Sequence, residues 1–135
     1  MKVRDVMTRQ VVTAAPTDSV QAVARLMVDT DTGAIPIEVP GVGNLVGIIT
    51  DRDIVMRIVA EGRASTTAVS EIMTVGLEGC QEDDEIDEAA RRMTELSMRR
   101  LVVYDAGREL SGIVTLAEIV AEQQRAARHG GGGRE

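Results

Sequence analysis

The stretch GIITDRD at residues 47–53 decides the fold, because it returns as GIVTLAE at residues 112–118. Each copy runs from an apolar, β-branched strand into a threonine that can cap the following helix, with an acid three residues later. A helix that begins in this way presents unpaired backbone N–H groups and the positive end of its dipole, which favours an anionic or polyhydroxylated ligand. The repeated stretch is therefore either a binding site or a helix cap.

The rest of the chain repeats in the same order. DVMT at residues 5–8 matches EIMT at 71–74, and the apolar helical stripe that includes Met27 matches one that includes Met93, both 66 residues later. Each copy predicts a β-α-β-β-α unit whose sheet face needs its twin for burial. We expect an α/β fold with two repeats related by a pseudo-twofold axis. Their expected bounds are 1–66 and 67–124, followed by a flexible Gly-rich tail at 125–135.

The first copy predicts its elements from local signals. Apolar residues spaced i, i+3, i+4, i+7 predict a helix from about Ser19 to Val28, capped by Thr17 or Asp18. Pro36 cannot donate a ladder hydrogen bond, so its strand is an edge strand or contains a bulge. The other expected elements are a short helix or turn at 3–8, strands at 11–13, 34–39 and 45–49, a hairpin loop at 40–44, and a helix at 51–60 closed by Gly62.

Composition excludes several classes of protein. The chain has 135 residues, 44% of them hydrophobic, with no Phe or Trp, so the core is aliphatic and the seven Met act as fillers. A net charge of −7 argues against a nucleic-acid partner. The lone cysteine, Cys80, and the lone histidine, His129, form neither a disulfide nor a metal site. The absence of a signal peptide and of a membrane-length apolar segment predicts a cytoplasmic protein.

The ordered set of motifs, DVMT, an amphipathic helix, GAIPI at 33–37 and LVGIITDRDI at 45–54, resembles a cystathionine-β-synthase (CBS) domain. Its repetition resembles the tandem pair called a Bateman module, over about residues 1–123. The resemblance implies that AMP, ADP, ATP or S-adenosylmethionine binds in a cleft between the repeats as a regulatory ligand, with no required cofactor. It also implies a disc-like homodimer.

Thr50, Arg52 and Asp53 form the first candidate site. By spacing alone, Thr50 and Asp53 are a helix cap. A carboxylate can also accept two hydrogen bonds from a ribose diol, and a threonine hydroxyl can meet a phosphate. The matching residues of the family do this, so the resemblance implies a nucleotide at Thr50 and Asp53, with Arg52 facing its phosphates.

Further candidates flank this first site. Val12, Ile35 and Pro36 could wall an adenine, as could Ile37, although core packing explains most of these residues. Arg99-Arg100 is a candidate phosphate clamp that the pseudo-twofold axis would carry to the first cleft, by family precedent for basic residues there. The alternative is a solvated basic pair that offsets the acidic run at 82–85.

The second copy offers a possible second site at Thr115 and Glu118. Glu118 replaces the aspartate with a side chain one methylene longer, and Leu116-Ala117 replaces Asp51-Arg52. A phosphate there would lose hydration without gaining a cation. We therefore expect one nucleotide per chain, on the Asp53 side.

These features predict a non-enzymatic sensor that shifts its conformation on binding and acts on an unknown effector protein. The alternatives are a ligand-free structural or interaction protein, and an enzyme, for which no nucleophile with a base is present. The second helices carry more apolar residues than one core needs, which predicts a homodimer through them. The residues concerned are Ile54, Val55, Ile58, Val59, Ile119 and Val120.

Overall fold

The computed structural model describes residues 1–9, 12–42 and 45–134, with side chains up to Arg128. The chain forms two compact units. We call Val12–Leu77 the Asp53 unit, and Met1–Val11 together with Glu78–Glu135 the Glu118 unit. These units differ from the repeats expected at 1–66 and 67–124, because the segment that leads each repeat packs into the unit of the other repeat.

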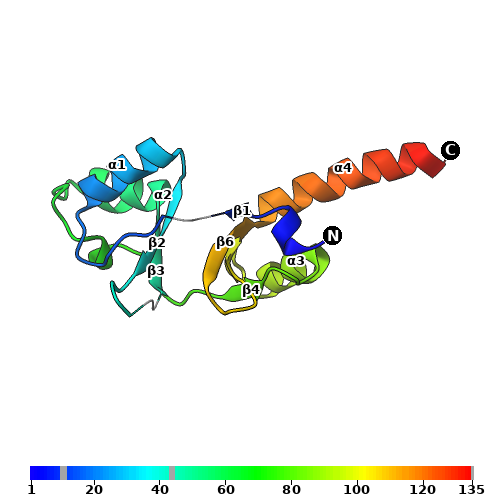
Figure 1. Cartoon of the computed structure of the whole chain (residues 1–135). Coiled ribbons are helices and arrows are strands. Elements are labelled where there is room, and N and C mark those ends of the chain that lie inside the picture. Colours follow the sequence, from blue (N-terminus) through cyan, green and yellow to red (C-terminus); the bar gives the residue numbers. More distant parts are fainter. Residues whose placement is uncertain (10–11, 43–44, 135) are drawn as a thin grey trace. The chain divides into compact units, whose positions relative to one another are not determined.

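The Asp53 unit contains one hairpin and its helices. Strands β2 (Ala34–Glu38) and β3 (Leu45–Thr50) are antiparallel, with Ala34 opposite Thr50 and a bulge between Ile37 and Glu38. Figure 1 shows helix α1 (Val20–Thr30) beside the short α2 (Asp51–Ile54), and these two helices contact each other. A π-helix, η2 (Val55–Val59), continues α2, and a 3₁₀ turn, η3 (Val69–Glu71), follows.

The Glu118 unit contains a four-stranded sheet in the order β1-β6-β5-β4. The antiparallel strands are β1 (Thr8–Arg9), β6 (Leu110–Thr115) and β5 (Arg100–Tyr104), and β4 (Gly79–Gln81) runs parallel to β5. The 3₁₀ turn η1 (Val3–Asp5) precedes β1, and helix α3 (Ile86–Glu95) contacts α4 (Leu116–Arg134). Helix α4 continues through residues 125–134, where the sequence predicted a tail. Its segment at 125–128 is rich in good helix formers, with an ion pair between Arg125 and Glu122.

The Asp53 unit has the same strand plan, but two of its strand pairings are reduced to single bridges. Single bridges from Ala14 to Ile37 and from Thr74 to Ile48 stand where the Glu118 unit has β4 and β1. The predicted strand at 11–13 is therefore wrong for the described residues 12 and 13, since the bridging residue is Ala14, while Val11 lies outside the described residues.

Two prolines explain why the parallel pairing is shorter in the Asp53 unit. In the Glu118 unit, Val102 N donates to the Glu78 carbonyl at 3.2 Å and Glu82 N donates to the Tyr104 carbonyl at 3.1 Å. The equivalent donors are Pro36 and Pro16, which have no N–H group. The expectation that Pro36 marks an edge or a bulge is thereby confirmed: its missing donor lies on the side of the single bridge, and the bulge begins at the next residue.

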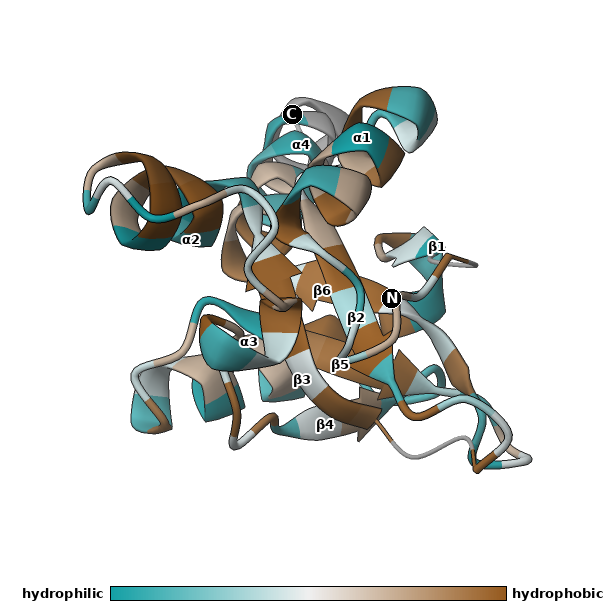
Figure 2. Ribbon diagram, turned by 90° about the vertical axis from the view of Figure 1, so that its left-hand side faces the viewer, coloured by the Kyte–Doolittle hydropathy of each residue, from teal (hydrophilic) through white to brown (hydrophobic). Residues whose placement is uncertain are grey.

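The sequence predicted an aliphatic core formed between the twin repeats; the core is aliphatic, but each unit has one of its own. Figure 2 shows β3, β5 and β6 largely in the colour of hydrophobic residues. The core of the Asp53 unit contains Ala14, Val20, Val23, Met27, Ile35, Ile37, Ile49, Ile58, Val69 and Ile72. The core of the Glu118 unit contains Val3, Cys80, Ile86, Ala89, Met93, Leu101, Val103, Val114 and Ile119. Most positions correspond between the two repeats, with Cys80 in the place of Ala14.

The cap of α1 differs from the prediction. Ser19 is the N-cap, because its hydroxyl accepts a hydrogen bond from Ala22 N at 3.1 Å. Asp18 instead accepts from Ala15 N at 2.9 Å within the preceding turn. The predicted helix at 51–60 is present as α2 with η2, and Gly62 closes it with a φ of 66°. Across the described residues, no helix has the length and apolarity that a membrane crossing requires.

Candidate functional site

Thr50 and Asp53 cap α2 reciprocally. Thr50 Oγ1 accepts a hydrogen bond from Asp53 N at 3.1 Å, and Asp53 Oδ2 accepts one from Thr50 N at 2.9 Å. The capping role is thus confirmed. The other carboxylate oxygen of Asp53, Oδ1, accepts no hydrogen bond from any described residue, and the side chain is half-buried. One face of this carboxylate is therefore open to a ligand.

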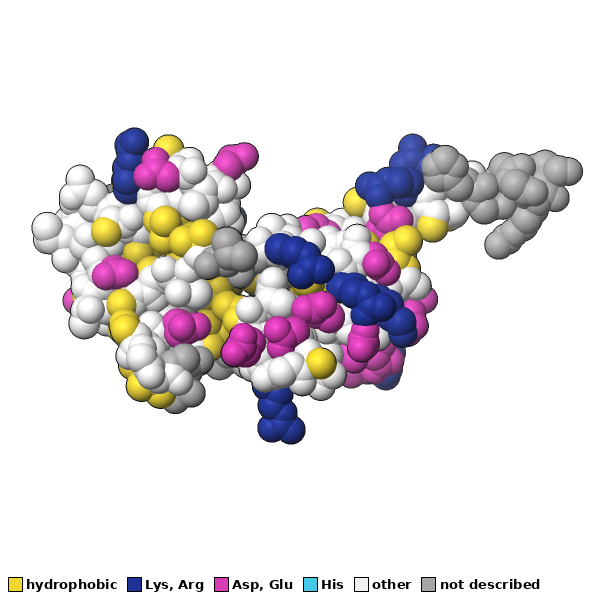
Figure 3. Space-filling model, in the orientation of Figure 1, with side chains coloured by type: hydrophobic (Ala, Val, Ile, Leu, Met, Phe, Trp, Pro, Cys, Tyr) yellow, Lys and Arg dark blue, Asp and Glu magenta, His cyan; other side chains and the backbone are white. Residues whose placement is uncertain are grey.

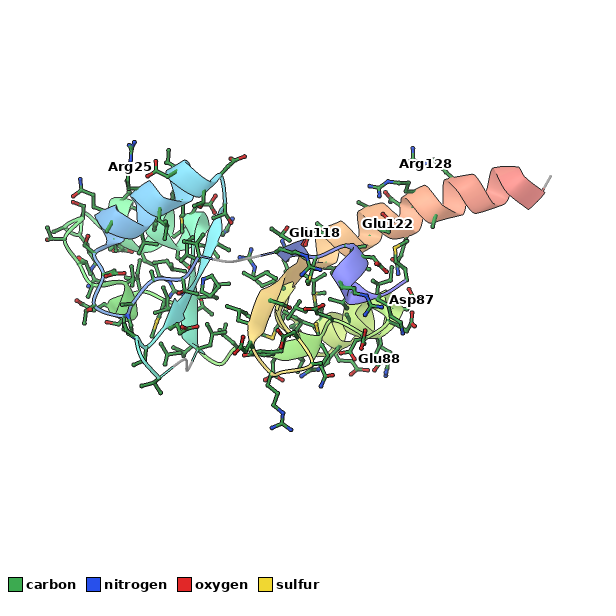
Figure 4. The ribbon with its side chains drawn as sticks, in the orientation of Figure 1. Arg25, Asp87, Glu88, Glu118, Glu122 and Arg128 are labelled. Atoms are coloured by element: carbon green, nitrogen blue, oxygen red, sulfur yellow. The ribbon has the colours of Figure 1, made fainter. Side chains whose placement is uncertain are left out.

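Thr115 and Glu118 repeat this cap at the start of α4, where Figure 4 places Glu118. Glu118 Oε1 accepts from both Thr115 N at 2.9 Å and Thr115 Oγ1 at 3.1 Å. Glu118 Oε2 accepts from the hydroxyl of Thr8 at 2.7 Å. Both oxygens of this carboxylate are therefore engaged, unlike those of Asp53.

The neighbours of the two caps differ in charge. Ala34 lies opposite Thr50 on β2, while Arg100 lies opposite Thr115 on β5. The carbonyl of Arg99 accepts from Leu116 N at 2.8 Å, as that of Gly33 accepts from Asp51 N at 2.9 Å. The structure therefore places both arginines beside the cap of the Glu118 unit. That Arg99 and Arg100 bind the phosphate of a ligand held at Asp53 stays a prediction.

Arg52, which precedes Asp53 in the sequence, is exposed. Its backbone N donates to Asp51 Oδ1 at 2.8 Å, and no side-chain ion pair of Arg52 occurs within the described part of the chain. Its guanidinium is thus available to an anionic group. Asp51, the acid between Thr50 and Arg52, is also exposed and takes no part in the capping box.

The apolar candidates on β2 are buried. Ile35 and Ile37 are fully buried in the core of the Asp53 unit, so the core-packing alternative is confirmed for both residues. Ile35 therefore has no surface to offer an adenine. Pro36, across from Ile48 on β3, is also buried, whereas Val12 is half-buried.

Exposed apolar side chains lie on α1 and η2 of the Asp53 unit, and Figure 3 shows hydrophobic side chains on the visible side of this unit. We call this set the α1–η2 face, and it contains Val28, Val55, Met56 and Val59, which are 69, 58, 51 and 69% exposed. Val28 and Val55 also line a pocket of about 450 Å³ between α1 and α2. Among the residues expected at a dimer interface, Ile58 and Ile119 are instead core residues and Ile54 packs against the core, because these positions face the sheet.

Cys80 is a potential nucleophile of the Glu118 unit. Burial raises the pKa of the Cys80 thiol to about 11, with the nearby Asp84 acting in the same direction. A thiol with this pKa stays protonated at neutral pH and is a poor nucleophile. Burial also raises the pKa of Tyr104, which lines a second pocket with Gly79, Gln81 and Arg108. No group of His, Cys, Asp and Glu suited to a metal occurs among the described residues.

Sequence reasoning missed Thr8. The repeated motifs DVMT and EIMT place a threonine at residues 8 and 74, and the change from Asp53 to Glu118 lengthens the acid in one copy. Both features can be read from the sequence. Only the pairing of β1 with β6, which joins residues about a hundred positions apart, shows that Thr8 lies beside Glu118.

Comparison with known proteins identifies the family. The CBS domain family matches residues 3–60 and 69–125. The CBS domain-containing protein YhcV of Bacillus subtilis (strain 168) is 39% identical over 121 residues, which cover 90% of this chain and 84% of YhcV. The structure of CBSX2 in complex with AMP matches with a TM-score of 0.68 and 25% identity, over 92% of this chain and 96% of that one.

The CBS domain pair of protein MJ0100, solved in complex with 5′-methylthioadenosine and S-adenosyl-L-methionine, matches with a TM-score of 0.76 and 27% identity. That match covers 100% of this chain and 98% of the other. Two family matches along one chain agree with the two capped repeats described above. The chain therefore belongs to the CBS domain family and contains a pair of CBS repeats.

Proposed function

We propose that this chain is a non-enzymatic regulatory sensor that binds one adenosine-containing ligand at Asp53. The candidate ligands are AMP, ADP, ATP and S-adenosylmethionine. The observation that carries the proposal is that Asp53 completes the capping box with Oδ2 alone, which leaves its Oδ1 without a hydrogen-bond partner among the described residues. The neighbours in complex with AMP and with S-adenosyl-L-methionine support the choice of an adenosine group.

In this proposal, different residues of the Asp53 unit bind different parts of the ligand. The ribose diol donates hydrogen bonds to the Asp53 carboxylate, which uses its open oxygen first. The Thr50 hydroxyl and the Arg52 guanidinium meet the phosphate or carboxylate end of the ligand. Val12, which is half-buried, supplies apolar contact for the adenine. No cofactor is needed, because the ligand itself is the signal.

Signalling follows from differential affinity. A ligand that binds one conformation of the pair more tightly than another shifts the population toward it, by no more than the difference in binding free energy. An effector protein in the cytoplasm then reads the shifted conformation. The net charge of −7 disfavours nucleic acid as that partner.

We also infer that the chain forms a homodimer through the α1–η2 face. Exposed apolar residues gathered on one surface mark an association site. Val59→Glu would place a charge in that interface and shift the mass measured by light scattering toward the monomer. Val42→Glu, at an equally exposed valine of the hairpin loop, is the control and leaves the mass unchanged. A monomeric wild-type protein at micromolar concentration would overturn this inference.

Calorimetric titration with AMP tests the ligand proposal. Asp53→Asn keeps an oxygen for the capping box but removes the charge, so we expect AMP affinity to fall by about 1–3 kcal/mol, or roughly five- to 150-fold. Asp51→Asn removes a neighbouring charge outside the capping box and serves as the matched control. Equal affinities for wild type and Asp53→Asn would leave Asp53 a helix cap alone.

The same titration separates the sensor from the ligand-free alternative. A folded protein that binds none of AMP, ADP, ATP or S-adenosylmethionine would instead be a structural or interaction protein. The α1–η2 face would then be the surface through which it binds other proteins.

A further inference from the structure

We propose that Thr8 is a positioning residue that closes the second repeat to ribose, by holding the Glu118 carboxylate oxygen that a ribose hydroxyl would otherwise take. This inference rests on the proposed function, since it assumes that the open acid of the first repeat binds an adenosine ligand. It assigns the expected asymmetry between the repeats to a hydrogen bond within the Glu118 unit, although Arg99 and Arg100 lie beside the cap of that unit.

The two acids differ in the number of hydrogen bonds that they accept. The Glu118 carboxylate accepts three hydrogen bonds, two on Oε1 from Thr115 and one on Oε2 from Thr8. Asp53 accepts one, on Oδ2. A carboxylate has about four acceptor positions, so Glu118 keeps one, on Oε2, and the two hydroxyls of a ribose diol could both bind there only by displacing the Thr8 hydroxyl. Asp53 presents no such competitor among the described residues.

The sheet holds Thr8 at this position. Thr8 lies opposite Ile113 and Arg9 lies opposite Gly112 in the pairing of β1 with β6. A Cβ on Gly112 would lie 2.5 Å from the Thr8 carbonyl oxygen, so the two strands are in close contact there. A hydroxyl fixed by its own backbone competes with a free ligand at high effective concentration. Thr8 therefore outcompetes ribose without a large binding energy of its own.

The length of the acidic side chain, Asp53 or Glu118, decides which repeat is closed to ribose. Thr74 is the counterpart of Thr8, and it exchanges backbone hydrogen bonds with Ile48 at 3.0 and 2.9 Å. Its hydroxyl nevertheless makes no hydrogen bond to Asp53 within the described chain. Asp53 is one methylene shorter than Glu118, so its carboxylate stays with Thr50. The extra methylene of Glu118 carries its second oxygen to Thr8.

Calorimetric titration with AMP on the full chain tests the proposal through stoichiometry. We expect one AMP per chain for the wild type and a second, weaker binding step in Thr8→Val, with second-site affinity raised at least about tenfold. Valine keeps the β-branched shape that suits β1. Thr74→Val makes the same change in the other repeat and should leave one AMP per chain with unchanged affinity.

Exchanging the two acids provides a test that does not alter β1. Glu118→Asp should release Thr8 and open the second site, as Thr8→Val does. Asp53→Glu should reach Thr74 and weaken binding at the first site by about tenfold or more. Adding Thr74→Val to Asp53→Glu should then restore most of the lost affinity.

The outcomes distinguish this proposal from the proposed function. One AMP per chain in the wild type, Thr8→Val and Glu118→Asp alike would overturn the role of Thr8 and leave the sensor standing. Two equivalent sites in the wild type would also overturn it. No AMP binding by the wild type or any variant would overturn the proposed AMP site itself, and the role of Thr8 with it.

Discussion

The Asp53 unit and the Glu118 unit have similar strand plans, and each has its own aliphatic core and a capped helix, yet the two caps differ. In the Asp53 unit the acid is short, its second oxygen is open, and the residues beside the cap are Gly33 and Ala34. In the Glu118 unit the acid is longer and engaged by Thr8. The difference shows that the same helix cap can leave one carboxylate oxygen without a protein partner in one repeat and engage both oxygens in the other.

A second contrast concerns the packing of the same plan. The Glu118 unit completes its parallel strand, whereas the prolines of the Asp53 unit reduce that strand to one bridge. The Asp53 unit also carries the α1–η2 face and a pocket beside it. We therefore expect the Glu118 unit to be the more tightly packed of the two, and the following predictions test that difference.

The largest expected effect is on core packing. Met93 is fully buried in the Glu118 unit, and its counterpart Met27 lines the pocket between α1 and α2. We predict that Met93→Ala lowers the free energy of unfolding by about 3–5 kcal/mol and Met27→Ala by about 2–3 kcal/mol, because a site beside a pocket loses fewer contacts. Urea denaturation measures both. A larger loss for Met27→Ala would reverse the proposed difference in packing.

The next effect concerns the glycines at which the leading segments pack. A Cβ on Gly112 would lie 2.5 Å from a backbone oxygen of Thr8, whereas one on Gly47 would lie 2.6 Å from the flexible side chain of Met73. We expect Gly112→Ala to cost about 2–3 kcal/mol of stability and Gly47→Ala about 1–2 kcal/mol. Thermal unfolding of the two variants checks the order. Equal losses would indicate that both segments adjust alike.

Alkaline pH should weaken the Glu118 unit through Cys80. The unfolded thiol ionises near its ordinary pKa of 9.0, while burial raises the folded pKa to about 11. Between these values the unfolded state loses the proton and the folded state keeps it, so stability falls as pH rises, by about 2 kcal/mol at most. Cys80→Ala, which copies Ala14, should remove this part of the decline. Unfolding curves at pH 8, 9, 10 and 11 for both proteins measure it, and identical slopes would contradict it.

The smallest expected effect concerns Arg99 and Arg100. If they serve the phosphate of the ligand at Asp53, the double variant Arg99→Ala with Arg100→Ala weakens AMP binding by about tenfold, more at low salt, and leaves adenosine nearly unaffected. Calorimetry with both ligands separates the two cases. Equal losses for AMP and adenosine would show that the pair does not contact the phosphate.

Local signals predicted most of the fold. The offset of 66 residues revealed the repeat, the apolar spacing predicted α1, and the threonine and acid predicted both caps. The sequence did not predict that β1 pairs with β6 or that Thr74 bridges to Ile48, because these contacts join distant residues with little local signature. The exact cap of α1 was also missed, since Thr17, Asp18 and Ser19 are all good cap residues and only the backbone path selects Ser19.

The candidate site was predictable in its residue types but not in their engagement. The family motif pointed to Thr50 and Asp53, and the structure supplies their reciprocal hydrogen bonds. The burial of Ile35 follows from strand alternation, although the sequence offered both faces. The engagement of Glu118 by Thr8 depends on strand pairing and on one methylene, neither of which composition or spacing expresses.

The most direct test of the account is where AMP binds, read from backbone amide resonances of the full chain during an AMP titration. We predict that the amides of Thr50 and Asp53 shift progressively and saturate at one AMP per chain, while those of Thr115 and Glu118 shift little. Shifts centred on Thr115 and Glu118, or equal shifts at both caps, would contradict the central claim that Asp53 is the binding acid.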